Sequence, residues 1–244
     1  MVSALNRFED PTVFGKVAVV YGGSSSEREV SLWSGEAVLR ALQSQGIDAH
    51  GIDTAEVALL SHLVTESFDR VFIVLHGRGG EDGVLQGALE YLDLPYTGSG
   101  VLASSVGMDK LKSKQIWQAL GLPVLESYLL NSEADVERLA PLLRYPVAVK
   151  PAEEGSSIGV SRVERAEDLM AAWKAAGGYN SPVFAENWII GNGEYTCAIL
   201  NGTALPIIRM ETDLAFYDYE AKYLREDTRY FCPSGLSQAD EMRF

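Results

Sequence analysis

Apolar positions in the first hundred residues alternate between continuous runs and helix-like spacing. Val17–Tyr21 and Val71–Leu75 are continuous, largely β-branched runs, and a shorter strand is expected near Ile47–Ile52. Such runs are typical of strands that are buried on both faces of a parallel sheet. Apolar residues at helical spacing predict the intervening helices over 30–42, 57–63 and 84–92. Strands that alternate with helices through short glycine-rich turns predict a doubly wound parallel sheet.

The pattern changes near Gly98-Ser99-Gly100, where we expect a domain boundary. Beyond it, the sequence predicts helices over 109–120, 133–143 and 166–175, and strands over 124–130, 146–150, 159–163 and 183–188. Asn201-Gly202 lies between two apolar stretches and is a strong signal for a type I′ hairpin turn. We expect a second boundary near residue 191.

Composition narrows the class of protein. The 244 residues are 47% hydrophobic and 22% charged, which is ordinary for a globular protein. Because 20 basic residues face 34 acidic ones and no basic cluster stands out, we expect neither a nucleic acid nor an anionic membrane surface as a partner. A small anionic ligand is compatible with this charge, since a pocket needs only a few local cations.

The cysteines and the apolar runs indicate the cellular compartment of the protein. Cys197 and Cys232 are too few for a disulfide framework and suggest reduced thiols. The N-terminus has no apolar signal-peptide core, and no apolar run approaches the ~18 residues that a membrane span needs. We expect a soluble, cytoplasmic protein.

Glu27 is the first candidate for chemistry. The strand Val17–Tyr21 stops at Gly22-Gly23 and a helix follows, so backbone N–H groups meet the sheet edge where open α/β sheets bind ligands. Glu27 follows Ser24 by three positions, which suggests either a capping box or a carboxylate aimed at a cationic ligand group. The local pattern leaves both interpretations open.

The loop from His76 to Gly83 carries four glycines in eight residues directly after a strand. The sequence suggests either that His76 and Arg78 hold a carboxylate there or that the loop is flexible and its arginine solvated. Gly98-Ser99-Gly100-Val101-Leu102-Ala103 matches the dinucleotide fingerprint in form, but no strand is predicted before it, so we do not expect a nicotinamide site. A P-loop motif is absent from the sequence.

The most specific local signal is Lys150-Pro151 followed by Gly155-Ser156-Ser157-Ile158-Gly159. A lysine at the end of a strand, beside a loop of small residues, can hold phosphates with its charge and with backbone N–H groups. Lys110 offers a second cation. Together they predict a nucleotide-binding site unlike a P-loop.

These segments, with Met108-Asp109-Lys110 and the stretch Phe216–Tyr223, strongly resemble those of the D-alanine–D-alanine ligases, ATP-grasp enzymes of bacterial cell-wall synthesis. The resemblance runs in order over nearly the whole chain. It implies an N-terminal ligase domain over 1–98, a central ATP-grasp lobe over 99–190 and the start of a C-terminal lobe over 191–244. It also implies ATP-dependent ligation of two D-alanines through an acyl phosphate, ATP and Mg²⁺ (or Mn²⁺) as cofactors, and a homodimer.

The resemblance assigns roles to particular residues. Glu27 is expected to bind the ammonium of the first D-alanine, and His76 to lie near its carboxylate. Ser156 is expected to orient Glu27 and Tyr223. Six residues are implied in ATP binding: Lys110, Lys150, Glu186, Ile189, Glu194 and Lys222. Lys222 and Tyr223 belong to a mobile loop that closes over the site and excludes water.

Two departures from the family pattern bear on activity. Asn187 stands where many members have a lysine against the adenine. The family's metal ligands, an Asp and a later Glu-x-Asn, have no counterpart here, so we predict no metal-binding residue within the chain, a truncated third lobe and no ligase activity for residues 1–244. The alternatives are an inactive remnant that binds at most nucleotide or a partner, and a D-alanine–D-lactate ligase, although Tyr223 favours the dipeptide product.

Overall fold

The computed structural model describes residues 10–177, 181–191, 193–214 and 216–243. They form two compact units. The first unit runs up to Leu125 and also takes in Ala152–Gly155, while the second holds Glu126–Pro151 and the chain from Ser156 onward. The first unit is therefore discontinuous in sequence. The division into three lobes stays a prediction.

A three-stranded parallel sheet forms the centre of the first unit. Its order is β2 (Ala49–Asp53), β1 (Val17–Tyr21), β3 (Arg70–Ile73). Helices α1 (Arg28–Ser44), α2 (Leu59–Thr65) and α3 (Val84–Tyr91) connect or follow the strands. The predicted alternation of strands and helices is confirmed.

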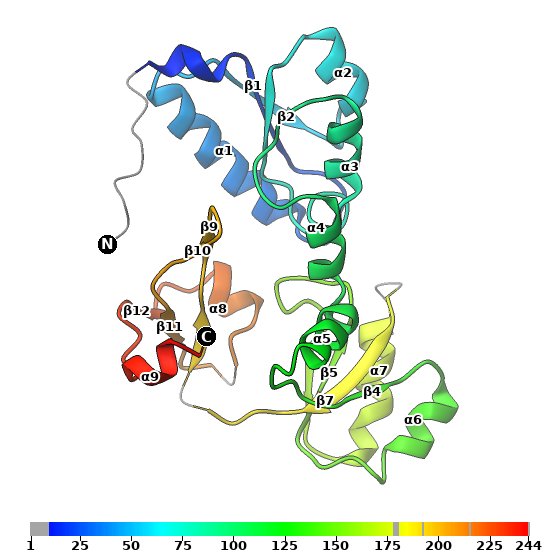
Figure 1. The fold of residues 1–244 in the computed structure, drawn as a ribbon. Coiled ribbons are helices and arrows are strands. Elements are labelled where there is room, and N and C mark those ends of the chain that lie inside the picture. Colours follow the sequence, from blue (N-terminus) through cyan, green and yellow to red (C-terminus); the bar gives the residue numbers. More distant parts are fainter. Residues whose placement is uncertain (1–9, 178–180, 192, 215, 244) are drawn as a thin grey trace. The chain divides into compact units, whose positions relative to one another are not determined.

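Alternate residues of β1 face opposite layers, which explains why the run is apolar throughout. Val17 and Val19 pack in one cluster with Val38 and Leu39 of α1. Ala18 and Val20 belong to a second cluster, with Leu63 of α2 and with Leu85 and Leu89 of α3. The sheet therefore lies between α1 on one face and α2 and α3 on the other, as the ribbon shows (Figure 1).

In the described part of the first unit, a 3-10 turn, η1 (Pro11–Phe14), precedes β1, and two further helices, α4 (Val101–Met108) and α5 (Lys110–Ala119), follow α3. Asp109 caps α5 by accepting hydrogen bonds from the N–H groups of Leu111 and Lys112. The sequence predicted α5 but not α4. Before α4, Tyr96 forms only an isolated bridge to Val71, not a full strand.

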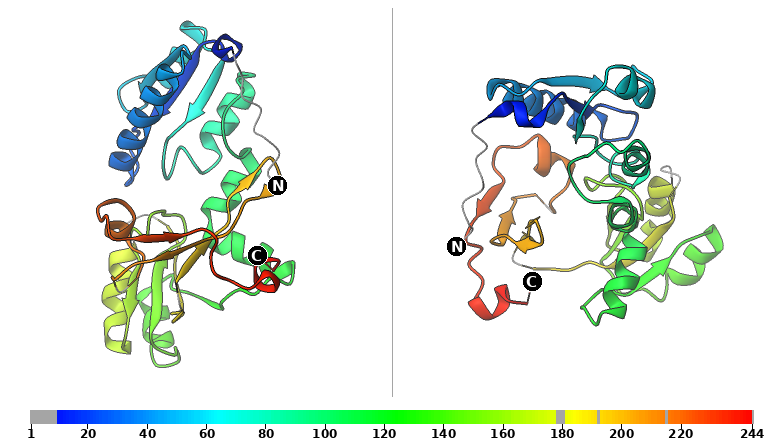
Figure 2. Two further views of the ribbon diagram at one scale, coloured as in Figure 1. Left: turned by 90° about the vertical axis from the view of Figure 1, so that its left-hand side faces the viewer. Right: turned by 45° about the horizontal axis from the view of Figure 1, so that its top comes forward.

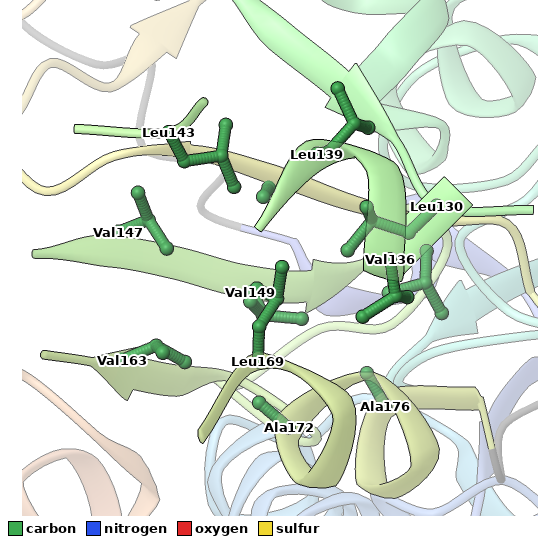
Figure 3. Close-up of a cluster of buried hydrophobic side chains, with 12 residues drawn as sticks. Leu130, Val136, Leu139, Leu143, Val147, Val149, Val163, Leu169, Ala172 and Ala176 are labelled. Carbon is green, nitrogen blue, oxygen red and sulfur yellow. The ribbon is translucent and has the colours of Figure 1, made fainter. Parts of the chain in front are cut away.

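The second unit holds a four-stranded antiparallel sheet. Its order is β4 (Ser127–Leu129), β7 (Val183–Asn187), β5 (Val147–Pro151), β6 (Ser161–Val163). Helices α6 (Glu133–Leu139) and α7 (Leu169–Gly177), the latter preceded by η2 (Ala166–Asp168), cover one face. Figure 3 shows the resulting core, in which Val147 and Val149 of β5 meet Leu169 and Ala172. Because side chains alternate along a strand, the residues of β5 and β7 that lie between these core positions point to the opposite face of the sheet.

Smaller elements complete the second unit, and two views make them visible (Figure 2). β8 (Glu194–Thr196), β11 (Ile208–Glu211) and β12 (Arg229–Phe231) form an antiparallel sheet in the order β12-β11-β8. β9 (Ile199–Leu200) and β10 (Thr203–Ala204) form the predicted hairpin, with positive φ at both Asn201 and Gly202. The short helices are α8 (Tyr219–Tyr223) and α9 (Gln238–Glu241).

Candidate active site

The turn after β1 is fixed by an ion pair between Arg28 and Asp53. Arg28 Nη1 and Nη2 lie 2.9 and 2.6 Å from the two carboxylate oxygens of Asp53, and Nη1 also donates to the carbonyl of Gly23 at 2.9 Å. Asp53 accepts from the N–H groups of Gly23 and Ala55. The Arg28 guanidinium, helped by these two N–H groups, lowers the pKa of Asp53 to about 2.

Glycine is required at the start of this turn. Gly22 has φ +75°, and a Cβ atom there would lie 2.2 Å from Asp53 Oδ1. The N–H of Gly22 donates to Ser31 Oγ at 2.9 Å, and the Ser31 hydroxyl donates to the carbonyl of Val74 at 2.6 Å. The buried Ser31 thus ties the first turn of α1 to the ends of β1 and β3.

Glu27 is buried at this turn, with 2% of its surface exposed. It occupies the N-cap position of α1, and its side chain forms no capping hydrogen bond. The capping box with Ser24 is therefore wrong, because the helix begins at Arg28 and not one turn earlier. Two glycines enclose the carboxylate: a Cβ on Gly77 would lie 2.8 Å from Glu27 Oε2, and one on Gly155 would lie 2.7 Å from the same atom.

The loop after β3 lies beside the same turn. The Ser25 hydroxyl donates to the carbonyl of His76 at 2.7 Å, so the backbone of His76 lies close to the turn that carries Glu27. The loop is held by its own carboxylates, since Gly77 N–H donates to Glu81 at 2.7 Å and Gly79 N–H donates to Asp82 at 3.0 Å. Two backbone N–H groups of the loop are thus bound by carboxylates of the same loop, while 59% of the Arg78 side chain is exposed.

Lys110 contacts the chain in a way that the sequence did not predict. Its ammonium donates to the carbonyl oxygens of Ala152, at 3.3 Å, and Glu154. Ser26 Oγ donates to the Glu154 carboxylate at 2.7 Å, and Arg78 lies 3.8 Å from Glu153. The segment Ala152–Gly155 is thereby attached to the first unit next to Glu27.

In the second unit, Lys150 and Glu186 form an ion pair on the sheet face opposite α6 and α7. Lys150 Nζ lies 2.5 Å from Glu186 Oε1, with 21% and 9% of the two side chains exposed. The lysine also lies 5.7 Å from the ring centroid of the buried Phe184. Lys150 is therefore not merely solvated. Strand alternation on β5 and β7 puts both charges outside the helix-covered core.

The remaining predicted nucleotide residues are more open. Ile189 follows β7 and is largely exposed, and Glu194 is exposed on β8. Asn187 ends β7 with its side chain exposed. Beside them, Trp188 packs edge-on against Phe216 with ring centroids 5.3 Å apart, and the Arg162 guanidinium lies 5.2 Å from the Trp188 ring. These aromatic and cationic contacts were not predicted from the sequence.

Residues 216–223, called here the closing loop, are attached to Ser156 and Ser157. The hydroxyls of Ser156 and Tyr223 are 2.7 Å apart. Lys222 Nζ donates to Ser157 Oγ at 2.9 Å, and Ser157 Oγ donates to the carbonyl of Tyr217 at 3.1 Å. The resemblance implies this contact between Ser156 and Tyr223, and the roles of both residues, including that of Ser156 toward Glu27, stay predictions.

The described residues contain neither a cluster of three metal-ligating side chains nor a helix that could span a membrane. No three of their His, Cys, Asp and Glu side chains are grouped so as to hold a metal ion. The Mg²⁺ or Mn²⁺ ion implied by the resemblance therefore finds no ligand set in the described part of the chain. Within the same ranges, no helix is both long and apolar enough to cross a bilayer.

The buried glutamate at the first turn of the parallel sheet, and the lysine–glutamate pair on the antiparallel sheet, suit a ligase of the ATP-grasp class. Family models agree: "D-ala D-ala ligase N-terminus" matches residues 52–99, and "D-ala D-ala ligase C-terminus" matches residues 116–243. The chain belongs to the D-alanine–D-alanine ligase family, whose members are ATP-dependent.

Relatives support this assignment along most of the chain. A D-alanine–D-alanine ligase of Methylococcus capsulatus is 57% identical over 235 residues, which is 96% of this chain and 75% of the relative. One of Ectopseudomonas mendocina is 56% identical over 238 residues, or 98% of this chain and 75% of the relative. The chain thus spans about three quarters of the length of these relatives.

Solved structures share the fold. The D-alanine–D-alanine ligase of Bacillus anthracis is 32% identical with a TM-score of 0.74, and covers 92% of this chain and 73% of its own. The VanG D-Ala:D-Ser ligase of Enterococcus faecalis is 29% identical with a TM-score of 0.73, over 93% and 79% of the two chains. The predicted fold class, an N-terminal parallel sheet followed by an ATP-grasp domain, is confirmed.

Proposed function

We propose that this chain binds ATP and D-alanine in the ATP-dependent ligation of two D-alanines to D-alanyl-D-alanine, a step toward peptidoglycan precursors. The observation that carries the proposal is the 51–57% identity to D-alanine–D-alanine ligases over 95–99% of the chain. Local chemistry supports it, because the residues at the sheet edges suit an ammonium group and a nucleotide.

The reaction joins a carboxylate to an amine. The carboxylate of the first D-alanine takes the terminal phosphoryl group of ATP, which leaves ADP and an acyl phosphate. The amine of the second D-alanine then attacks the acyl carbon, the amine loses a proton, and phosphate departs. Both steps gain from orientation of the reactants and from exclusion of water.

Glu27 is proposed to bind the ammonium of the first D-alanine. A carboxylate that is 2% exposed binds a cation more strongly than one in water, because the surroundings screen the attraction less. Gly77 and Gly155 let the backbone approach the carboxylate closely, where any larger residue would collide with it. His76 is proposed to lie near the substrate carboxylate.

The nucleotide is proposed to engage Lys150 and Glu186 in the second unit. Lys150 supplies a cation for phosphates, and Glu186 an acceptor for the adenine amino group. Their mutual ion pair keeps both side chains ordered before a ligand arrives. Lys110, Ile189, Glu194 and Lys222 are proposed as further ATP contacts, as the resemblance implies.

Ser156 and Tyr223 are proposed to hold the closing loop over the reacting groups. Their hydroxyl contact supports this role, because it connects the loop to the serine beside Gly155. An ordered cover protects an acyl phosphate from hydrolysis. A cytoplasmic location and a homodimer are also proposed, and light scattering of the purified protein tests the dimer.

Calorimetric titration with ATP, and separately with D-alanine and L-alanine, tests the proposed function. We expect ATP and D-alanine to bind and L-alanine to bind much more weakly. Phosphate release and chromatography of the dipeptide then report on the complete reaction. Absence of binding by both ATP and D-alanine would contradict the proposal.

A further inference from the structure

Ser157 contacts the closing loop at two places, although only its neighbour Ser156 was predicted to be functional. Its hydroxyl donates to the carbonyl of Tyr217, near the start of the loop, at 3.1 Å. The same oxygen accepts from the ammonium of Lys222, near the end of the loop, at 2.9 Å. One hydroxyl therefore connects both ends of the loop to the segment 156–159.

The backbone at this position is unusual. Ser156 and Ser157 have φ of +50° and +61°, so two consecutive residues with side chains lie in the left-handed region that favours glycine. Such a conformation is strained for a residue with a side chain and persists where the surroundings impose it. Here it directs two adjacent hydroxyls toward the same loop, one to Tyr223 and one to Lys222 and Tyr217.

The contacts around Lys222 reinforce this arrangement. Its ammonium lies 5.4 Å from the ring centroid of Tyr217, which is a cation–π distance. The Tyr217 hydroxyl lies 3.3 Å from that of Tyr230 on β12. Burial, and next the hydrogen bond with Tyr230, raise the pKa of Tyr217, so this ring stays neutral at physiological pH. The loop is thus held between Ser157 on one side and β12 on the other.

We propose that Ser157 is a positioning residue that holds the closing loop in place and keeps the Lys222 ammonium oriented before nucleotide arrives. The inference rests on the proposed function of Lys222 as an ATP contact. A lysine that is already ordered loses less conformational freedom when it binds a phosphate. Removal of the Ser157 hydroxyl therefore loosens the loop first and weakens ATP binding as a consequence.

Hydrogen exchange of the amides in residues 216–224 measures the attachment of the loop directly and needs no ligand. We expect Ser157→Ala and Ser157→Gly to lower protection there about tenfold, since a hydrogen bond to a charged group is lost. Glycine accepts the positive φ without strain, so agreement between the two variants assigns the loss to the hydroxyl. Ser157→Asn, which tolerates the same backbone and offers a side-chain carbonyl, should restore most of the protection.

Ser161→Ala on β6 is the matched control, because it removes a hydroxyl from a strand of the same unit and not from the segment 156–159. Wild-type protection in both Ser157→Ala and Ser157→Gly overturns the proposal, and so does an equal loss in Ser161→Ala. The melting temperature identifies a variant that has lost its fold. If Ser157→Ala is such a variant, the amide protection in Ser157→Gly decides whether the Ser157 hydroxyl holds the loop.

ATP titration gives the functional consequence. We expect Ser157→Ala to weaken ATP binding several-fold and to leave D-alanine binding unchanged, whereas general damage affects both ligands. Failure of the wild-type chain to bind ATP contradicts the proposed function, while the exchange measurement still decides whether Ser157 holds the loop. Unchanged ATP affinity in a variant with a loosened loop overturns the orienting role for Lys222.

Discussion

Asp53→Asn removes the charge that fixes the turn before Glu27 while it keeps the size of the side chain. The amide oxygen can still accept from the N–H groups of Gly23 and Ala55, which Asp53 Oδ1 accepts in the folded chain. What the variant loses is the two-point contact with the Arg28 guanidinium. The expected result is a lower free energy of unfolding, with a particular dependence on pH.

The size of the effect follows from the pKa of Asp53. A decrease from 3.8 to about 2 corresponds to ~2.5 kcal/mol, at about 1.4 kcal/mol for each pH unit. Water reaches part of the ion pair, since 36% of the Arg28 side chain is exposed against 11% for Asp53. Screening reduces the contribution, so we expect Asp53→Asn to lower the free energy of unfolding by about 1–2 kcal/mol at neutral pH.

The sign of the pH dependence is fixed by the direction of the shift. Because the folded pKa lies below the unfolded one, the ionised carboxylate stabilises the fold fully above about pH 5. The stabilisation disappears as the pH falls through the unfolded pKa of 3.8 toward the folded pKa of about 2. Urea denaturation of wild type and variant, at about pH 7 and about pH 3, measures the difference.

Glu36→Gln is the matched control, because Glu36 pairs with Arg40 on the same helix at the surface, with 59% and 70% of the two side chains exposed. An exposed pair of this kind contributes under about 0.5 kcal/mol. If Asp53→Asn destabilises the chain equally at both pH values, the charge of Asp53 is not the cause. If it destabilises no more than Glu36→Gln, the ion pair does not fix the turn.

Four further substitutions test the site. Glu27→Gln should weaken D-alanine binding at least tenfold and leave ATP binding intact, since the partner of the ammonium loses its charge. Calorimetry measures both affinities, and an unchanged D-alanine affinity would show that Glu27 does not bind the substrate. Gly155→Ala should also weaken D-alanine binding about tenfold, because its Cβ would lie 2.7 Å from Glu27 Oε2. Gly107→Ala is the control and should have no effect, since no atom lies within 4 Å of its new Cβ. Lys150→Met should weaken ATP binding, and it should lower the free energy of unfolding by about 3 kcal/mol because Glu186 loses its cation. A Lys150→Met chain as stable as wild type would refute the stabilising role of the ion pair. Tyr223→Phe should shift the product toward D-alanyl-D-lactate when D-alanine and D-lactate compete. Because residues 1–244 are predicted to be inactive, the product ratio is measured in a chain extended with the C-terminal part of a family member, and a parental ratio argues against selection by Tyr223.

Short-range patterns predicted most of the fold because they report local constraints. The run Val17–Tyr21 is apolar at every position because both faces of β1 are covered. Asn201-Gly202 predicted a hairpin because both residues accept positive φ. The sequence did not predict helix α4, because Gly98-Ser99-Gly100 is typical of a domain boundary. Glycines of this kind carry no signal for a helix that follows them.

The site was less predictable, because its contacts join residues that are distant in sequence. Arg28 and Asp53 are 25 positions apart, and nothing in either local pattern indicates the other. Lys110 contacts backbone carbonyls, which every residue carries, so its partners leave no sequence signal. Glu27 had two local interpretations, and only the observed start of α1 removed the capping box.

The discontinuity of the first unit sets the order in which its parts become available during synthesis. A ribosome makes the chain from the N-terminus, so the three strands of the parallel sheet exist once Ile73 has emerged. Glu154, the partner of Ser26, is made 128 positions after it, when β4, α6 and β5 of the second unit have already been translated. Gly155, which lies beside the Glu27 carboxylate, arrives one residue later. The enclosure of Glu27 is thus the last part of the first unit to be completed, and a nascent chain that stops before Gly155 carries the parallel sheet without it.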